Sequence, residues 1–161
     1  MKRTTIILLT LLALTSVSTL VAWAGSAHFI KNRTTASCTN TSNLEVCFKE
    51  AGLESGAVET VTVLGNGSAD YQCINGGNKN PNAANKETVG GPISNSQTFA
   101  ADQNGNITGC ILLFPPGPGS FSCPPGQQLV GPTNVSFSNV SLVDQTSGAE
   151  ASLGSTTFSC P

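Results

Sequence analysis

The chain is a succession of short runs of β-branched and aromatic residues, each followed by Gly, Pro, Asn or Ser. Apolar and polar positions alternate within these runs, which is typical of β-strands. After residue 25 no segment keeps a helical period for more than two turns; in Phe48–Leu53, the nearest approach, Gly52 and then Gly56 break it. The pattern predicts ten strands: Ala27–Lys31, Leu44–Lys49, Val58–Leu64, Ala69–Ile74, Thr88–Ile93, Gln97–Ala101, Ile107–Phe114, Gln128–Val130, Val135–Val143 and Ser155–Cys160.

Many short strands without helices predict an all-β fold, an antiparallel β-sandwich of immunoglobulin-like kind. Asn104-Gly105 lies between two predicted strands and favours a type I′ hairpin turn over Asp102–Asn106. Gly65-Asn66-Gly67 indicates a reversal or a bulge. Ile111–Phe114 is apolar at successive positions, which predicts a strand covered on both faces at the centre of a sheet.

The segment Thr133–Val143 changes phase within one strand. Val135 and Phe137 share one phase, whereas Val140 and Leu142 share the other. A one-residue bulge near Ser138 would direct all four apolar side chains into the core. The same bulge would turn two asparagines outward, Asn134 and Asn139.

Residues 1–24 have the pattern of a secretory signal peptide. Lys2 and Arg3 precede the apolar run Ile6–Ala24, and Ala22-Trp23-Ala24 is a small-x-small cleavage motif. The alternative is a retained membrane anchor, because 19 residues can just span a bilayer. The cleavage motif and the polar residues within the run favour removal. We therefore expect a secreted, extracellular protein whose residues 25–161 form a single domain with no membrane association.

The charge of residues 25–161 excludes two classes of partner. Five basic and nine acidic side chains remain there, and no Lys or Arg follows Lys86. Nucleic acids and anionic lipid surfaces are bound by clustered cations, which this segment lacks. We expect no nucleic acid partner.

Six cysteines behind a signal peptide predict three disulfides. Their spacing forms no C-x-x-C motif and the chain has one His, so neither a zinc site nor any other metal or cofactor site is expected. A short polar excursion separates Cys38 from Cys47, which favours that pair as a hairpin staple. The remaining pairs are then predicted as Cys73–Cys123 and Cys110–Cys160.

Six N-x-[ST] sequons make the protein a candidate glycoprotein. In a eukaryotic source several would carry glycans, whereas Asn, Ser and Thr can equally supply turns and a neutral polar surface. The six asparagines are Asn32, Asn40, Asn66, Asn106, Asn134 and Asn139.

Catalytic and calcium-binding groups are hard to assemble from this sequence. The alternating oxygens that start at Asp102 have Ile107 where a calcium loop needs Gly and Leu113 where it needs Glu, so the turn is the better interpretation. A Ser–His–acid triad would have to use His28, and no G-x-S-x-G motif is present. A glycosidase would need two carboxyl groups across a cleft. The carboxylates considered for that role are Asp70, Glu87, Asp102, Asp144 and Glu150.

Three motifs resemble a family of small secreted proteins that is uncharacterised and predicted to be all-β. They are Phe48–Leu53, the segment Tyr71–Lys86 with its Cys73 and Asn75-Gly76-Gly77, and Phe121–Gln127 with its Cys123. The resemblance covers most of residues 26–145 and implies no activity. It favours the pairing of Cys73 with Cys123, because both lie inside the matching motifs.

These observations favour a non-enzymatic extracellular protein that acts by surface contact, in adhesion, envelope structure or interaction with a host or neighbour. The alternative is a secreted binding or inhibitory module that recognises a protein or glycan through two long loops, Asn75–Lys86 and Pro115–Gly126. An extracellular hydrolase is a third hypothesis. The loop residues considered for binding are Asn78, Lys79, Asn85, Lys86, Pro115, Pro116 and Pro118.

Overall fold

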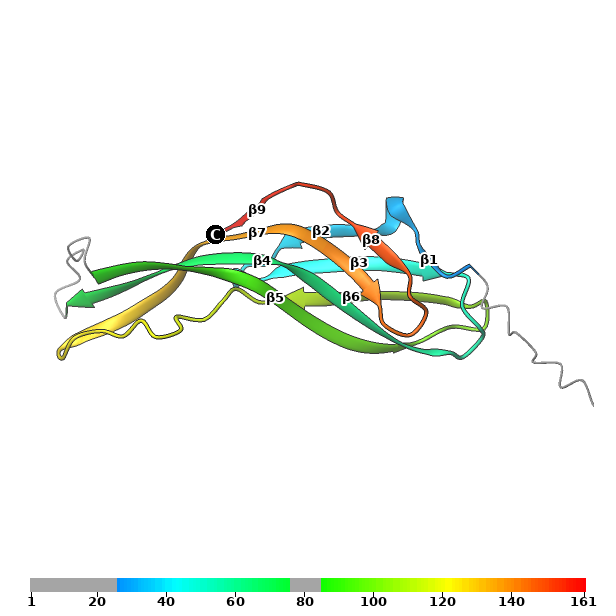
Figure 1. Cartoon of the computed structure of the whole chain (residues 1–161), viewed down its shortest axis with the longest axis horizontal. Coiled ribbons are helices and arrows are strands. Elements are labelled where there is room, and N and C mark those ends of the chain that lie inside the picture. The colour runs from blue at the N-terminus through cyan, green and yellow to red at the C-terminus, as the bar shows by residue number, and fades with distance from the viewer. Residues whose placement is uncertain (1–25, 76–84) are drawn as a thin grey trace, which may run out of the picture.

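The computed structural model describes residues 26–75 and 85–161, which form two antiparallel β-sheets packed face to face (Figure 1). The smaller sheet, sheet A, is built around β3. One edge of β3 pairs with β6 along its whole length, and the other pairs with β1 and β2 in turn. A short 3-10 helix, η1, links β1 to β2. The bounds are β1 His28–Phe29, η1 Lys31–Arg33, β2 Thr35–Cys38, β3 Leu44–Ala51 and β6 Asn106–Leu113.

The larger sheet, sheet B, has the order β5-β4-β7, with β8 and β9 both paired to the outer edge of β7. Its three main strands are much longer than any strand of sheet A. The bounds are β4 Val58–Asn75, β5 Lys86–Ala100, β7 Gln127–Asp144, β8 Glu150–Ser152 and β9 Phe158–Cys160. The predicted antiparallel sandwich is confirmed, and two packed antiparallel sheets are compatible with an immunoglobulin-like arrangement.

Three pairs of predicted strands are in fact single long strands. Of the reversal or bulge predicted at Gly65–Gly67, the reversal is wrong, because β4 continues through these residues and pairs with β5 at each of them. The bulge agrees with the register shift against β7 between Leu64 and Asn66. Prediction from the sequence missed β2 and β8, both of which are short edge strands with few apolar residues. The glycines of the turn signal inside β4 are therefore positions where neighbouring side chains come close rather than a chain reversal.

The core lies between the inner faces of the two sheets. From sheet A it receives the alternate residues of β3 and β6, and from sheet B the alternate residues of β4 and β7. The largest fully buried apolar side chains are Leu44, Val46, Phe48, Val61, Val63, Ile107, Ile111, Leu113, Val135, Phe137 and Leu142. The strand Ile107–Phe114 was predicted to be central, but β6 is an edge strand of sheet A and Phe114 is 51% exposed.

Sheet B extends past sheet A, and the Pro-rich segment 115–126 covers the extension (Figure 1). The Tyr71 hydroxyl donates a hydrogen bond of 2.6 Å to the carbonyl oxygen of Pro116. A Cβ on Gly67 would lie 2.9 Å from Cδ of Pro116, so the segment packs directly on β4. The Cys73–Cys123 disulfide joins the far end of the segment to the same strand. Residues 115–126 are thus a second packing layer and not a free loop.

Strand β7 contains three bulges, each at a residue with positive φ. The register against β4 shifts by one residue after Leu64, after Ser68 and again after Asp70. The left-handed residues at these shifts are Asn139 (φ 51°), Asn134 (φ 47°) and Gly131 (φ 139°). The predicted bulge near Ser138 is confirmed, since Val135, Phe137, Val140 and Leu142 are all buried while Asn134 and Asn139 are exposed.

Deleting Asn139 should be tolerated, because it removes the extra residue of a bulge and leaves Phe137 and Val140 facing the core. We expect a loss of about 1 kcal/mol, mainly from altered twist. Deleting Ser136 is the matched control. That deletion forces either Val135 or Phe137 out of the core and should cost about 3–5 kcal/mol. Urea unfolding of both variants checks this, and an equal loss in the two would contradict the assigned bulge.

The three predicted disulfides are present, but two of the three predicted pairings are wrong. Cys73–Cys123 is confirmed. Cys38 pairs with Cys160, not Cys47, because β2 of sheet A lies beside β9 of sheet B. Cys47 pairs with Cys110, which stands directly opposite it across β3 and β6. One disulfide therefore links the two sheets, one links two strands of sheet A, and one fastens the Pro-rich segment.

The Asp102–Asn106 turn connects β5 of sheet B to β6 of sheet A, so the predicted type I′ hairpin is wrong. Asn104 does not have the positive φ that a type I′ turn needs, whereas Gly105 has φ 70°. The Asp102 carboxylate accepts hydrogen bonds from the backbone N–H groups of Asn104 and Asn106. The bond from Asn106 is the main cause that holds the pKa of Asp102 below its ordinary value, and the bond from Asn104 acts in the same direction. Its Oδ1 atom organises the turn.

Candidate functional site

The outer face of sheet B carries hydroxyl and amide side chains over three adjacent long strands. Alternation puts the odd-numbered residues of β4 inside, so the even-numbered ones point outward together with their partners on β5 and β7. We call this surface the polar face. It comprises Asn66, Ser68, Asp70 and Gln72 of β4, Thr88, Ser94, Ser96 and Thr98 of β5, and Asn134, Ser136, Asn139 and Ser141 of β7. The same outward register also presents Leu64 of β4 and Lys86, the β5 partner of Gln72, so the charged residues of this surface are Asp70 and Lys86.

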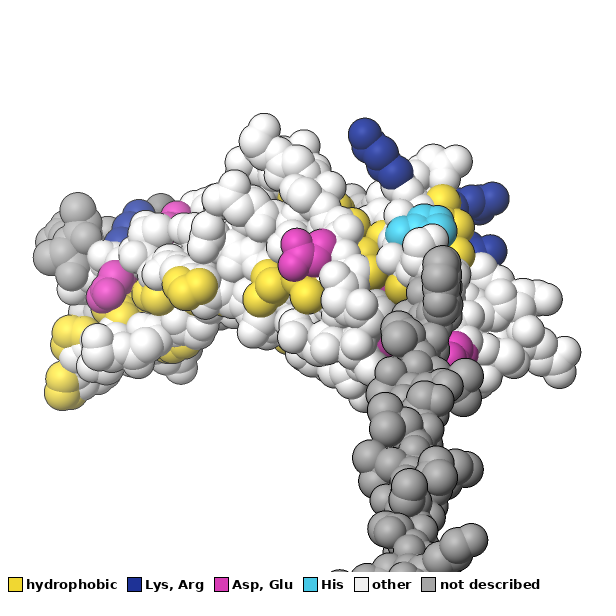
Figure 2. Space-filling model, turned by 45° about the vertical axis from the view of Figure 1, so that its right-hand side comes forward, with side chains coloured by type: hydrophobic (Ala, Val, Ile, Leu, Met, Phe, Trp, Pro, Cys, Tyr) yellow, Lys and Arg dark blue, Asp and Glu magenta, His cyan; other side chains and the backbone are white. Residues whose placement is uncertain are grey.

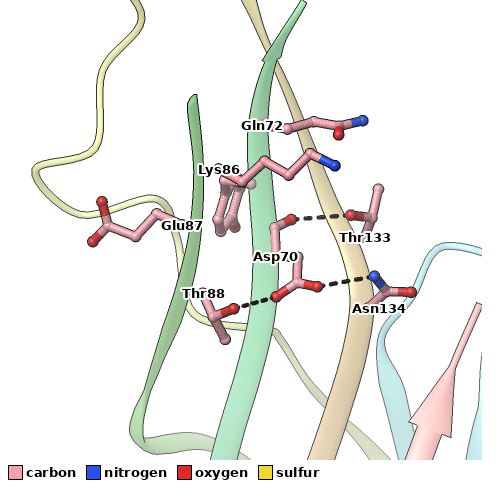
Figure 3. A pocket seen from close by; sticks show the side chains of 8 residues that line it. Asp70, Gln72, Lys86, Glu87, Thr88, Thr133 and Asn134 are labelled. Carbon is pink, nitrogen blue, oxygen red and sulfur yellow. Dashed lines mark hydrogen bonds between the residues drawn. The ribbon is translucent and has the colours of Figure 1, made fainter. Parts of the chain in front are cut away.

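Asp70 lies in a depression of about 240 Å³ near the end of the polar face (Figure 3). Its Oδ1 accepts a hydrogen bond of 2.6 Å from the Thr88 hydroxyl, and its Oδ2 accepts one of 2.9 Å from the Asn134 side-chain amide. The three long strands of sheet B, β4, β5 and β7, each contribute one of these residues. The carboxylate is therefore fixed in orientation before any ligand arrives.

The same hydrogen bonds keep Asp70 ionised. Donation by Thr88, then by Asn134, holds the pKa of Asp70 below its ordinary value, and the Lys86 ammonium acts in the same direction. In Figure 3 the Lys86 side chain extends toward Gln72, over the depression, whereas Glu87 points away from Asp70. The depression thus presents one fixed anion, one cation and two amides to solvent.

The predicted loop residues divide into three groups. Asn78 and Lys79 lie outside the described residues. Asn85 and Lys86 flank the entrance to β5, where the Asn85 amide donates to Oε1 of Gln127 and Lys86 borders the Asp70 depression. The three prolines, Pro115, Pro116 and Pro118, are half-buried in the segment that packs on β4. Lys86 is the loop residue that the structure brings to the candidate site.

Three of the six sequon asparagines lie on the polar face: Asn66, Asn134 and Asn139. Asn32 in η1 and Asn40 in the β2–β3 turn are also exposed, and Asn106 is half-buried with its amide directed at Asp102. The side-chain amide of Asn134 already serves as a donor to Asp70. Glycosylation at these positions remains a prediction.

The carboxylates considered for hydrolysis do not form a pair in a pocket. Asp70 and Glu87 border one depression but point in different directions (Figure 3). Asp102 lies in its turn, Glu150 is exposed on β8, and Asp144 is fully buried. The acids that do come together are Glu50, Glu59 and Asp144, of which the sequence reasoning had considered only Asp144. His28 is exposed on β1, with Nδ1 2.6 Å from the carbonyl oxygen of Ser26.

Charged side chains are sparse on the surface shown in Figure 2, where single acidic groups are separated by uncharged atoms; most of the basic groups lie beside the single His, and basic atoms also appear at the opposite end. Three of the basic residues, Lys31, Arg33 and Lys49, belong to η1 and β3. In the described residues one group of side chains has metal-ligand spacing, Glu45 with Cys47 and Cys110. Its two sulfur atoms are bonded to each other, so they offer no thiolate ligand.

No family model, curated protein or solved structure matches the chain. The resemblance to a family of small secreted proteins therefore stays a prediction. Within residues 26–75 and 85–161, no helix is long and apolar enough to cross a membrane. Three disulfides are compatible with an oxidising, extracellular setting.

Proposed function

We propose that this protein is secreted after removal of residues 1–24 and acts without catalysis, by contact between its polar face and an extracellular macromolecule. The observation that carries the proposal is the uncharged hydroxyl and amide surface, which spans β5, β4 and β7 and ends at the fixed Asp70 carboxylate. Hydroxyl groups both donate and accept hydrogen bonds, and amides supply two donors and an acceptor. Such a surface suits a partner that is itself covered with hydroxyl groups.

A neutral polysaccharide fits the polar face better than a protein does. Protein interfaces obtain most of their binding energy from buried Trp, Tyr and Arg side chains, and the polar face has none of these. The face also lacks the exposed Trp and Tyr rings on which sugars stack, so a polysaccharide would be held by hydrogen bonds alone. Its exposed area also lacks the clustered cations that a polyanion requires. A chain of neutral sugars can instead form many weak hydrogen bonds along the strands, with the Asp70 depression large enough for one sugar ring.

Sedimentation with insoluble polysaccharides tests this proposal. Oxidised, unglycosylated protein should be retained by at least one of cellulose, chitin, xylan, β-1,3-glucan and mannan, and 0.5 M NaCl should leave the retention unchanged because no ion pairs form. Asp70→Ala should weaken retention about 10- to 100-fold, since one charge-assisted hydrogen bond contributes about 1.5–3 kcal/mol. Glu45→Gln on the outer face of sheet A is the control.

The proposal fails if none of the five polymers retains the protein, or if Asp70→Ala binds as tightly as Glu45→Gln. Retention that disappears in 0.5 M NaCl also contradicts it, because this points to a charged partner. Binding is measured on glycosylated protein as well. Glycans at Asn66, Asn134 and Asn139 would cover the polar face and should reduce retention.

The second candidate is a secreted binding module of immunoglobulin-like kind that uses the end of sheet B. What favours it is that the Asp70 depression with Lys86 and the fastened Pro-rich segment lie at the same end of sheet B, on its two opposite faces. A protein partner would contact Pro118 and the exposed Gly119. Binding of a protein partner that is lost in Pro118→Glu but kept in Asp70→Ala would favour this candidate over the first.

A further inference from the structure

Three carboxyl groups are buried together at the opposite end of the sandwich from the Asp70 depression. Glu50 comes from β3, Glu59 from β4 and Asp144 from the end of β7, and their exposed fractions are 0%, 5% and 0%. Glu50 Oε2 and Glu59 Oε2 are buried and have no hydrogen-bond partner. Buried ionised carboxylates without a compensating donor are strongly disfavoured, so these atoms require a proton or another ligand.

Asp144 is the acceptor of this group. Its Oδ1 accepts from the backbone N–H groups of Thr146 (2.8 Å) and Ser147 (3.3 Å), and its Oδ2 accepts from the Ser147 hydroxyl at 2.8 Å. Three donors therefore converge on this one carboxylate. These bonds also fix the β7–β8 turn, residues 145–149, against the end of the sheet.

The hydroxyl of Ser147 lies within hydrogen-bond distance of two carboxylates, Glu50 and Asp144. Ser147 Oγ is also 3.2 Å from Glu50 Oε1 and accepts from the N–H of Ala149 at 3.2 Å. A hydroxyl has one hydrogen and two lone pairs. If its hydrogen goes to Asp144 at the shorter distance, the contact with Glu50 is a hydrogen bond only when Glu50 is the donor. A proton on Glu50 would satisfy both contacts at once.

No basic group is positioned to neutralise the cluster within the described residues. The strand partners of Glu50 are Phe29 on β1 and Ile107 on β6, and the β5 partner of Glu59 is Phe99. Lys49 lies on the opposite face of β3, and His28 is exposed. The charged groups that act on Glu50 are Asp144 and Glu59, both acidic.

A divalent cation does not suit this arrangement. Ligand oxygens around Ca²⁺ lie at about 2.3–2.6 Å from the ion, so any two of them are at most about 5 Å apart. In the described residues the three carboxylates are not among the groups whose ligand atoms all lie within 4.8 Å of one another. The ligand that the geometry supports is the proton.

We infer that Glu50, Glu59 and Asp144 form a proton-binding site that ties the β7–β8 turn to both sheets when protonated and repels it when ionised. Burial, followed by the charge of Asp144, raises the pKa of Glu50 from about 4.5 to about 7, and the same two causes raise the pKa of Glu59. The site would therefore bind a proton as the surroundings become mildly acidic. It gives the protein a stability that depends on extracellular pH.

The direction in which stability changes with pH follows from the linkage between proton binding and folding. The folded state keeps the Glu50 proton up to about pH 7, whereas the unfolded state releases it near pH 4.5. Stability is then greatest below the unfolded value and falls as the pH rises through the folded one. With these two pKa values the folding equilibrium constant should fall about 70-fold between pH 5 and pH 8. Glu59 adds to the fall in the same direction.

Urea unfolding at pH 5, 6, 7 and 8 tests the inference. Wild-type protein should lose stability over this range, Glu50→Gln should lose most of that slope, and Glu45→Gln, a half-buried change on the opposite face of β3, should keep it. The Gln side chain can still donate to Ser147, which is why it should fold. The inference would be overturned if the stability of the wild-type protein stayed constant or rose from pH 5 to pH 8. It would also be overturned if the stability of Glu50→Gln fell with pH as steeply as that of the wild-type protein.

Carbon-13 NMR of the side-chain carboxyls provides a second readout that needs no variant. The Glu50 carboxyl resonance should titrate near pH 7. Amides of residues 145–149 should exchange faster above that pH, after correction for intrinsic rates, than amides at the centre of β4. A Glu50 midpoint near 4.5 would show that the site binds no proton in the range proposed.

Discussion

Replacing Cys38 and Cys160 together by Ser should lower the free energy of unfolding by about 5 kcal/mol. This disulfide closes a loop of 122 residues, the longest of the three, so its removal gives the unfolded chain the most freedom. It also holds β9, a strand that is only three residues long, to the edge of sheet A. Because a domain of this size is stable by about 5–15 kcal/mol, the variant should be marginally folded at best.

Equilibrium unfolding in guanidinium measures the effect under oxidising conditions. Cys47→Ser with Cys110→Ser is the control, since that disulfide joins two strands that the β3–β6 ladder already holds in register. Its loop of 63 residues predicts a loss of about 4 kcal/mol and no detachment of a strand. A Cys38/Cys160 variant that is as stable as this control would contradict the idea that the inter-sheet disulfide fastens the sandwich.

Among single substitutions in the turns, Gly105→Ala should be the most destabilising. It should lower the free energy of unfolding by about 3–4 kcal/mol. A Cβ at this position would lie 2.0 Å from the carbonyl oxygen of Leu53, and the residue has φ 70°. The left-handed conformation costs a non-glycine residue about 1–2 kcal/mol, and overpacking costs about 1–3 kcal/mol more. The Leu53 N–H also donates to the Gly105 carbonyl at 3.1 Å, so relaxation would break that bond.

Gly56→Ala separates these two causes. Gly56 has a similar φ of 75°, but a Cβ there meets no atom within 4 Å. Gly56→Ala should therefore pay only for the left-handed conformation, which lowers the free energy of unfolding by about 1 kcal/mol. Thermal unfolding of the two variants gives the comparison. If both lose the same stability, the contact between the β5–β6 turn and Leu53 is not as tight as the structure has it.

Alternation along the chain predicted the inner face of the sandwich well. It also contained the signal for the buried acids, which was not followed. Glu50 continues the inward phase of Val46 and Phe48, Glu59 precedes Val61 in the same phase, and Asp144 follows Leu142. Reading each strand to its end would have put all three acids inside. Two similar pentapeptides follow each other in β7, Thr133–Phe137 and Ser138–Leu142. Each contains one bulge, at Asn134 and at Asn139, whereas the alternation of apolar residues predicted only the second.

Pairings between distant segments could not be predicted in the same way. Which cysteine meets Cys38 depends on β2 and β9 lying at neighbouring edges of different sheets, and no local pattern specifies that. Strand length was misjudged for a related reason. Gly65 and Gly67 are typical of a turn, but here their missing side chains leave room for Leu113 and Pro116. The Asp70 depression needs three strands in register, so only its residue types were visible beforehand.

The central claim is that the polar face is the surface through which this protein acts. Amide chemical-shift mapping with a soluble oligosaccharide of whichever polymer retains the protein tests it most directly. We predict shifts that centre on Ser68, Asp70, Thr88 and Asn134 and extend along β4, β5 and β7. Shifts confined to residues 115–126, or to Lys49 and Thr108 on the outer face of sheet A, would contradict it.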